Sequence, residues 1–219
     1  MESGQKLKLV LASGSPRRKE LLGWMKVPLK IRPSEVEEIT EKTDPVEVVE
    51  DLAALKGRDI LSLEIAEGES PFIVASDTIV FIDNKILGKP KDRDHARETL
   101  LSLSGREHHV YTAVYMAIKL PGKEVVEKSF VGKSHVTFCD ISPEILDLYL
   151  EGDEALDKAG AYGIQGQGLL FVEKMSGSYS NVVGFPLSDF IEEMKSFLSE
   201  VGLDGDNWRE IFNSQRTKV

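Results

Sequence analysis

The sequence predicts an α/β fold, with an elongated mixed sheet flanked by helices and two lobes separated by a cleft. Strand-like and helical segments alternate along most of the 219 residues, the pattern of a sheet that is at least partly parallel. Two long strand-like segments, 107–120 and 125–139, are joined only by the turn Pro121-Gly122-Lys123. This turn predicts an antiparallel hairpin attached to the parallel part.

In the first half of the chain, a strand over 6–12 leads into the loop Ser13-Gly14-Ser15-Pro16. Ser15 as N-cap and Pro16 at the first helical position predict that a helix begins here. The other elements expected in this half are a strand over 27–32, a helix from Pro45, strand-like segments over 72–75 and 79–82, a turn at Asp83-Asn84 and a strand over 85–87.

In the second half, a helix over 94–103 precedes the hairpin, and a glycine follows its end. Another helix begins near Ser142, with Ile145, Leu148 and Tyr149 expected on its inward face. A glycine-rich stretch over 160–168 and a last main helix over 186–198 follow. The tail after Gly202 is expected to be peripheral, with a short helix around Trp208 and Ile211.

Composition limits the function. The formal charge of −10 disfavours general binding to nucleic acid or to an anionic membrane, although one cleft could still hold an anionic small molecule. No apolar stretch approaches the roughly 20 residues of a membrane span. The single cysteine, Cys139, excludes an internal disulfide and argues against a thiolate metal site, and from this we expect a cytoplasmic protein.

The segment 13–18 is a candidate phosphate site. Free backbone N–H groups at a helix start attract anions, and Arg17 and Arg18 add guanidinium groups in the first turn. The alternative is a capped surface helix with two solvated arginines.

Asp77 is the candidate catalytic acid. It lies between apolar segments that end at Ala75 and begin again at Ile79, so we expect its carboxylate at the end of a buried strand. A carboxylate there is costly unless it meets a metal, a cation or a substrate proton. The alternative is an aspartate that caps a turn.

Other polar groups could complete such a site. One of Glu35, Glu37 and Glu38 could share a divalent cation with Asp77, although a run of glutamates is usually a solvated loop. Two lysines, Lys56 and Lys89, could point into the same cleft or remain surface lysines, and Gln165 in a glycine-rich stretch could read a base edge. We interpret His108 and His109 as structural, because no second ligand follows at metal spacing.

Taken together, these motifs resemble the Maf family of nucleotide pyrophosphatases. The matching pieces are SGSPRR at 13–18, VEE at 36–38, Lys56, SDTIV at 76–80, LGKP at 87–90, LSG at 103–105, DKAGAYGIQG at 157–166 and GSYSNVVGFPL at 177–187. The resemblance covers about residues 7–195. We therefore expect one two-lobed domain over 1–200 and a separate C-terminal tail over 201–219.

The resemblance implies a fold related to the inosine triphosphate pyrophosphatases, a homodimer and a divalent metal, Mg²⁺ or Mn²⁺. It also implies cleavage of a nucleoside triphosphate between the α- and β-phosphates, with release of pyrophosphate. The catalytic acid of the family falls on Asp77, and the supporting residues fall on Ser13, Arg18, Glu38, Lys56, Lys89 and Gln165. Residues Arg17, Thr78 and Gln165 resemble the combination in members that act on dTTP and UTP.

Two questions stay open at this point. Asp77 either deprotonates the attacking water or, with Glu38, is a metal ligand. The chain could also be a nucleotide-binding regulator of cell division, or a pyrophosphatase for modified or non-standard purine nucleotides.

Overall fold

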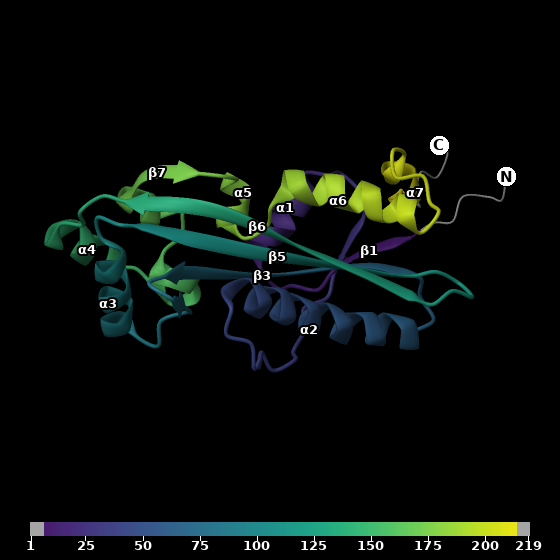
Figure 1. Ribbon diagram of the computed structural model, residues 1–219, viewed down its shortest axis with the longest axis horizontal. Coiled ribbons are helices and arrows are strands. Elements are labelled where there is room, and N and C mark those ends of the chain that lie inside the picture. The colour runs from purple at the N-terminus through teal and green to yellow at the C-terminus, as the bar shows by residue number, and fades with distance from the viewer. Residues whose placement is uncertain (1–6, 214–219) are drawn as a thin grey trace.

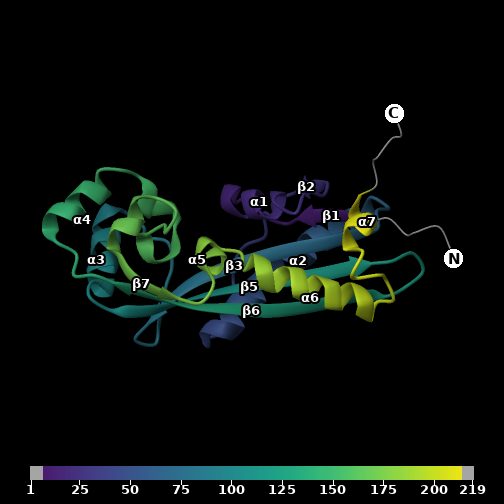
Figure 2. The same cartoon turned by 90° about the horizontal axis from the view of Figure 1, so that it is seen from above.

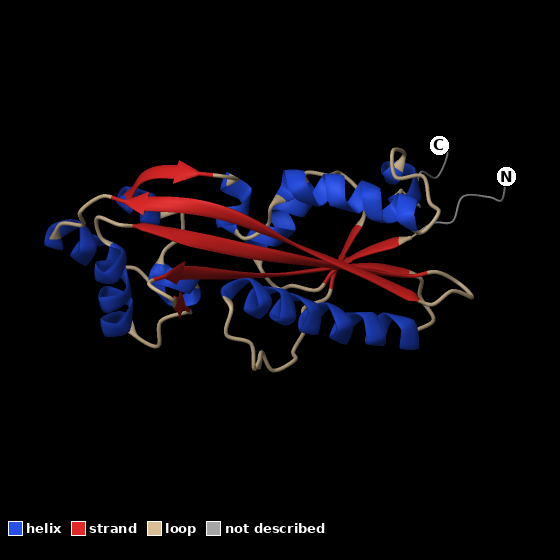
Figure 3. Ribbon diagram, in the orientation of Figure 1, coloured by secondary structure: helices blue, strands red, loops and turns tan. Residues whose placement is uncertain are grey.

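The computed structural model describes residues 7–213. A seven-stranded mixed sheet runs the length of an elongated molecule (Figure 1, Figure 3), in the strand order β2-β1-β3-β5-β6-β7 with β4 paired to β3. β1 is parallel to β2 and β3, and the remaining pairs are antiparallel. The strands are β1 Lys8–Leu11, β2 Leu29–Ile31, β3 Pro71–Ile82, β4 Lys85–Leu87, β5 Glu107–Lys119, β6 Val125–Phe138 and β7 Val172–Ser176.

Helices cover both faces of the sheet. In Figure 1, α2 lies on one face and α1 and α6 lie on the other, whereas α3 and α4 gather at the far end. Figure 2 shows the same two groups from above, which form the two predicted lobes. The helices are α1 Pro16–Gly23, α2 Pro45–Ala66, α3 Arg93–Leu103, α4 Pro143–Leu150, α5 Tyr179–Val183, α6 Leu187–Glu200 and α7 Trp208–Phe212, with 3₁₀ turns η1 Glu154–Asp157, η2 Ala159–Ala161 and η3 Gln167–Phe171.

The α2 helix sets one wall of the site. It begins where the Asp44 carboxylate accepts hydrogen bonds from the backbone N–H groups of Val46 and Glu47, a stable N-cap. Its buried face packs on the sheet, and a Cβ atom on Gly57 would fall on the ring of Tyr115 in β5. Because only glycine allows this close approach, the backbone around position 57 is held against the sheet.

The predicted break in the third strand is wrong. Asp77 lies in the middle of β3, paired with Ala113 of β5, rather than at a strand end. The polar residues stay in the strand because each has a partner. The Ser76 hydroxyl donates to the carbonyl of Gly184 at 3.2 Å, and the Thr78 and Thr112 hydroxyl oxygens lie 3.1 Å apart.

The predicted hairpin of β5 and β6 is confirmed, and so is the tight turn before β4, where Asp83 and Asn84 both adopt positive φ. The inward face predicted for α4 is partly wrong. Leu148 is 47 % exposed, and the buried residues are Leu146, Tyr149 and Leu150, because the apolar stripe lies one position to the side.

The predicted peripheral tail is also wrong for its described part. Phe212 in α7 is buried, and its ring lies 5.4 Å from that of Phe72 in β3. The backbone N–H of Leu7 donates to the carbonyl of Ile211 at 3.0 Å, which joins the first and last parts of the described chain. Residues 1–6 and 214–219 lie outside the described residues, including Lys6 of the first predicted strand and the last part of the predicted tail.

Within residues 7–213, no helix combines the length and apolar character that crossing a lipid bilayer requires.

Candidate active site

A cavity of about 810 Å³ opens between the two lobes. The loop after β1 and the start of α1 form one side, and the η1–η2 segment forms the other. The middle of β3 and the N-terminal half of α2 lie at its base. All nine residues that the sequence predicts for the site line this cleft: Ser13, Arg17, Arg18, Glu38, Lys56, Asp77, Thr78, Lys89 and Gln165.

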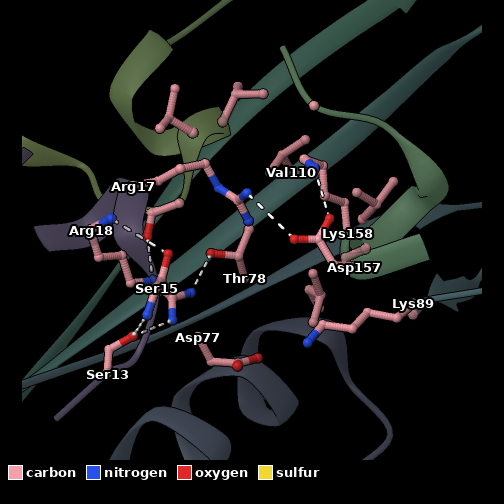
Figure 4. Close-up of a pocket in the computed structure, with 18 of the residues that line it drawn as sticks. Ser13, Ser15, Arg17, Arg18, Asp77, Thr78, Lys89, Val110, Asp157 and Lys158 are labelled. Carbon is pink, nitrogen blue, oxygen red and sulfur yellow. Dashed lines mark hydrogen bonds and ion pairs between the residues drawn. The ribbon is translucent and has the colours of Figure 1, made fainter. Parts of the chain in front are cut away.

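The start of α1 forms a cationic side of the cleft. The Ser15 hydroxyl caps the helix by accepting from the backbone N–H of Arg18 at 3.5 Å. The Arg18 guanidinium donates from Nε to the carbonyl of Gly184 at 3.0 Å and from Nη2 to Thr78 Oγ1 at 3.1 Å (Figure 4). These contacts fix its orientation before any ligand binds.

The electrostatics of Arg18 show how enclosed this side is. Burial lowers the pKa of its guanidinium, and the neighbouring charge of Arg17 lowers it further. Asp77 and Glu38 act in the opposite direction. A half-buried cation beside a second cation is stabilised when an anion joins them, so this side of the cleft suits a phosphate.

A lysine links the two carboxylates on the opposite side. The Lys56 ammonium lies 2.7 Å from Asp77 Oδ1 and 2.8 Å from Glu38 Oε2. Asp77 and Lys56 are nearly buried, whereas Glu38 is half-exposed. No hydrogen bond from residues 7–213 reaches Asp77 Oδ2. This second oxygen is therefore free to accept from water or to bind a cation.

Sequence reasoning gave no role to three charged residues that line the cleft, Glu154, Asp157 and Lys158. The Lys158 ammonium lies 2.7 Å from Asp157 Oδ1, and Arg17 Nη1 lies 4.0 Å from Asp157 Oδ2. Burial alone would raise the pKa of Asp157, but the hydrogen bond from Lys158 and the charges of Arg17 and Lys89 outweigh it, and the net pKa is lowered. The only signal in the sequence was the position of this pair at the start of the 157–166 motif.

The glycine-rich segment is held close to the sheet. Gly160 has φ +69°, and a Cβ atom there would lie 2.9 Å from the side chain of Val80 in β3. Only glycine satisfies both conditions. This contact positions the pair Asp157-Lys158 on one side and Gln165 on the other at the rim of the cleft.

The cleft therefore joins many charges in a small volume. Five cationic side chains line it together with four carboxylates: Arg17, Arg18, Lys56, Lys89 and Lys158 with Glu38, Asp77, Glu154 and Asp157. In Figure 4 the Lys89 amine points towards the Asp77 side. A chain of net charge −10 thus has a locally cationic hollow, which can attract a polyphosphate.

Comparison with known proteins agrees with this geometry. The family model described as Maf-like protein matches residues 8–197. The chain belongs to the Maf family. A dTTP/UTP pyrophosphatase of Lachnoclostridium phytofermentans is 42% identical over 189 residues, which are 86% of this chain and 94% of the relative. A dTTP/UTP pyrophosphatase of Bacillus thuringiensis subsp. konkukian is 45% identical over 196 residues, 89% and 97% of the two chains.

Among solved structures, the Ham1 protein of Staphylococcus aureus aligns with a TM-score of 0.40 at 16% identity, over 61% of this chain and 72% of that one. This likeness is too low to carry a conclusion. All nine predicted site residues of this Maf-family chain lie inside the matched range 8–197, whereas α7 lies beyond it.

The two adjacent histidines, His108 and His109, have different surroundings. His108 is structural, as predicted. It is buried, its Nε2 lies 2.8 Å from the Tyr162 hydroxyl, and burial lowers its pKa to about 4. The structural interpretation of His109 stays a prediction, but Glu107 and His135 lie beside this residue. The partner from β6 comes from strand pairing, which local spacing does not show.

Proposed function

We propose that this protein is a nucleoside triphosphate pyrophosphatase that converts dTTP and UTP to the monophosphate and pyrophosphate. The main observation behind this proposal is that the Lys56 ammonium joins Asp77 and Glu38 in the same cleft as the Arg18 guanidinium. The cleft therefore supplies cations for phosphates and carboxylates for water within one cavity. The two relatives that are named for this reaction support the same conclusion.

In this proposal, Arg18 and the N–H groups at the start of α1 bind phosphate oxygens, and Lys89 binds from the opposite rim. Arg18 is already held by Gly184 and Thr78, so little side-chain freedom is lost when the nucleotide binds. Preorganised cations at the place where charge develops lower the barrier for phosphoryl chemistry. This arrangement favours a triphosphate over a nucleoside.

Asp77 Oδ2 then holds the attacking water by accepting its hydrogen bond. The water oxygen forms a bond to the α-phosphorus while the bond from that phosphorus to the bridging oxygen breaks. Pyrophosphate leaves with the electron pair, and the water proton passes to Asp77 and then to solvent. Lys56 fixes Oδ1 of the same carboxylate at 2.7 Å, so the orientation of Oδ2 is set in advance.

The carboxylates also fit the divalent cation that the family implies. Glu38 and Asp77 share one ammonium at 2.8 and 2.7 Å, so both can reach a single cation, and oxygen donors are the ligands that Mg²⁺ and Mn²⁺ prefer. Glu38 and Asp77 would hold such an ion, which would neutralise phosphate charge and make water more acidic.

The base is read at the other rim in this proposal. No hydrogen bond within residues 7–213 restrains the exposed Gln165 amide, which offers both a donor and an acceptor to a pyrimidine edge. Arg17 lines the same cavity, with its Nη1 4.0 Å from Asp157 Oδ2. The Thr78 hydroxyl already contacts Arg18 and Thr112, so Thr78 acts in this proposal by holding the Arg18 guanidinium in place.

A nucleotide panel tests the proposal. The protein with Mg²⁺ or Mn²⁺ is given dTTP, UTP, CTP, ATP, GTP, ITP and 7-methyl-GTP, and monophosphate, pyrophosphate and orthophosphate are measured separately. We expect dTTP and UTP to give the highest kcat/KM, with pyrophosphate as the product. A purine substrate that exceeds both in kcat/KM would contradict the pyrimidine assignment, and orthophosphate as first product would contradict the bond assignment.

The matched variants are Asp77→Asn and Asp83→Asn. Both remove one carboxylate from the same strand or its turn, but Asp83 lies at the surface and pairs with Arg106. We expect Asp77→Asn to lose at least about a hundredfold in kcat, because the water-binding carboxylate is removed. Asp83→Asn should keep the activity.

A further inference from the structure

Three metal-binding side chains gather on one face of the β5–β6 hairpin, outside the cleft. His109 in β5 lies directly opposite His135 in β6. Glu107 precedes His109 by two residues in the same strand, so its side chain points to the same face. One ligand atom of each residue lies within 4.8 Å of those of the other two. The strand register therefore brings together an ordered set of ligands from two strands.

Their geometry is close to that of a coordination sphere. His135 Nδ1 lies 3.2 Å from Glu107 Oε1, and the two imidazole rings stand at 86° with their centroids 4.5 Å apart. Tetrahedral Zn²⁺ with bonds of about 2.0–2.2 Å separates neighbouring ligand atoms by roughly 3.3 Å. No hydrogen bond from residues 7–213 reaches the imidazole of His109.

We propose that Glu107, His109 and His135 bind a transition-metal ion of the Zn²⁺ class, with water completing the coordination. Two imidazoles and one carboxylate suit Zn²⁺, Co²⁺ or Ni²⁺ better than Mg²⁺, which prefers oxygen ligands. The exposed fractions of the Glu107 and His135 side chains, 54% and 36%, leave the site open to solvent ions.

Several charged groups face this site. Burial, with the charges of Lys133 and His135, lowers the pKa of His109, and the hydrogen bond from His135 lowers the pKa of Glu107. Lys133 and Lys174 carry charge that opposes a cation, but the Lys133 ammonium is held over the ring of Tyr111, 5.5 Å from its centroid.

The site is distinct from the cleft. None of the three residues lines the cavity. His109 pairs with Phe81 in β3, and Phe81 is four residues from Asp77 in that strand, so roughly 14 Å separates the two positions along the strand. An ion at this site cannot contact the carboxylates of the cleft, and its effect is to tie β5 to β6.

Cobalt binding to the full chain, freed of any affinity tag and treated with chelator, tests the proposal. Co²⁺ is titrated in the presence of millimolar Mg²⁺ and followed by calorimetry and by its visible absorption. We expect one Co²⁺ per chain with the absorption of a low-coordinate nitrogen-ligated ion, displaced by Zn²⁺. Absence of this absorption, or its presence without saturation at one equivalent, would overturn the proposal.

Variants separate the site from other ligands. His109→Gln and His135→Gln should each weaken Co²⁺ binding by at least about tenfold, whereas His95→Gln, which changes an exposed histidine in α3, should not. Asp77→Asn should leave the Co²⁺ absorption unchanged, so the result does not depend on the proposed catalytic function. Circular dichroism in chelator checks that each variant is folded, and Glu107→Gln provides a third variant that keeps both histidines. Equal affinity of the wild-type protein and His135→Gln would overturn the proposal.

Discussion

Lys56 has an unusual position, because one ammonium contacts two acidic groups of different exposure. Asp77 is nearly buried, and Glu38 lies in a loop that is half open to solvent. Without a cation between them, the two carboxylates would repel each other and Glu38 would turn outward. Lys56 therefore keeps the acidic side of the cleft assembled before the nucleotide and its metal arrive.

Replacing this lysine tests that role. Lys56→Met keeps the aliphatic stem and removes the charge. We expect kcat/KM for dTTP to fall by about a hundredfold or more, because Asp77 is no longer oriented. The matched control is Lys8→Met, which removes the exposed ion pair of Lys8 with Glu69. If both variants retained wild-type kinetics, Lys56 would have no part in the reaction.

At this scale the sequence predicted which residues share the cleft. Short motifs scattered between Ser13 and Gln165 predict nine residues that line one cavity, and their roles in the reaction stay a prediction. It could not predict which atoms meet. The bridge from Lys56 to Glu38 depends on how a loop folds back on α2, and Asp157 carries no local signal that separates it from a surface aspartate. The ligand set of His109 was missed because His135 is distant in sequence and adjacent only through strand register.

At the scale of elements, the contact between α2 and β5 carries Lys56 to the cleft. Gly57 allows the helix backbone to rest on the ring of Tyr115, one residue from Lys56. Tyr115 is itself fully buried, and burial raises the pKa of its hydroxyl well above the usual range. The ring cannot move aside without opening the core.

We therefore expect Gly57→Ala to destabilise the protein, although helix propensity alone predicts that alanine stabilises a helix. Alanine in a helix is favoured over glycine by about 1 kcal/mol, but a forced shift in a packed core costs about 1–3 kcal/mol. We expect urea unfolding to show a lower free energy of unfolding, together with a lower kcat because Lys56 shifts. Gly23→Ala is the control, since nothing lies within 4 Å of its added Cβ. A Gly57→Ala protein as stable and active as the wild type would show that the contact is not close.

The packing of β5 against the η2 turn predicts a pH effect. His108 has a pKa of about 4 in the folded protein and 6.5 ordinarily, so the unfolded chain binds its proton first as the pH falls. The stabilisation is present above pH 6.5 and is lost between pH 6.5 and 4, by about 3 kcal/mol in total.

Comparing His108→Gln with the wild type isolates this effect, because the carboxylates titrate alike in both proteins. Free energies of unfolding measured at about pH 7 and about pH 4 should fall less in the variant. The same measurement on His95→Gln should match the wild type. An identical loss in His108→Gln would mean that His108 is not the group that titrates.

Secondary structure was predicted best where local signals dominate. The cap at Ser15, the helix start at Pro45 and the turn after Leu120 depend on neighbouring residues. The continuity of β3 through Asp77 could not be predicted in this way, because the partners of its polar residues come from α2, β5 and the segment before α6.

For the whole molecule, Leu7 and Phe212, near the two ends of the described chain, both lie in the core. Phe212 packs edge-on against Phe72, which also contacts Phe197 of α6. The segment after the last main helix is thus part of the hydrophobic core, although the family match ends at residue 197. Its apolar residues are few and spaced by polar ones, which explains why the sequence suggested a peripheral tail.

Phe212→Ala measures how much this end contributes. Loss of a fully buried phenylalanine costs about 3–5 kcal/mol, so we expect a fall in the free energy of unfolding of that order. Glu210→Ala, on the exposed face of the same helix, should change it by less than about 0.5 kcal/mol. Equal stability of both variants would indicate that α7 does not pack on the sheet in solution.

The central claim is that water held by Asp77 attacks the α-phosphorus of a nucleotide whose phosphates lie along Arg18 and Lys89. Hydrolysis of UTP in ¹⁸O-labelled water, followed by mass spectrometry of both products, tests it directly. The account predicts that the label enters UMP and that pyrophosphate remains unlabelled. Label in pyrophosphate would place the attack on the β-phosphorus, and the assignment of the cleft would be wrong.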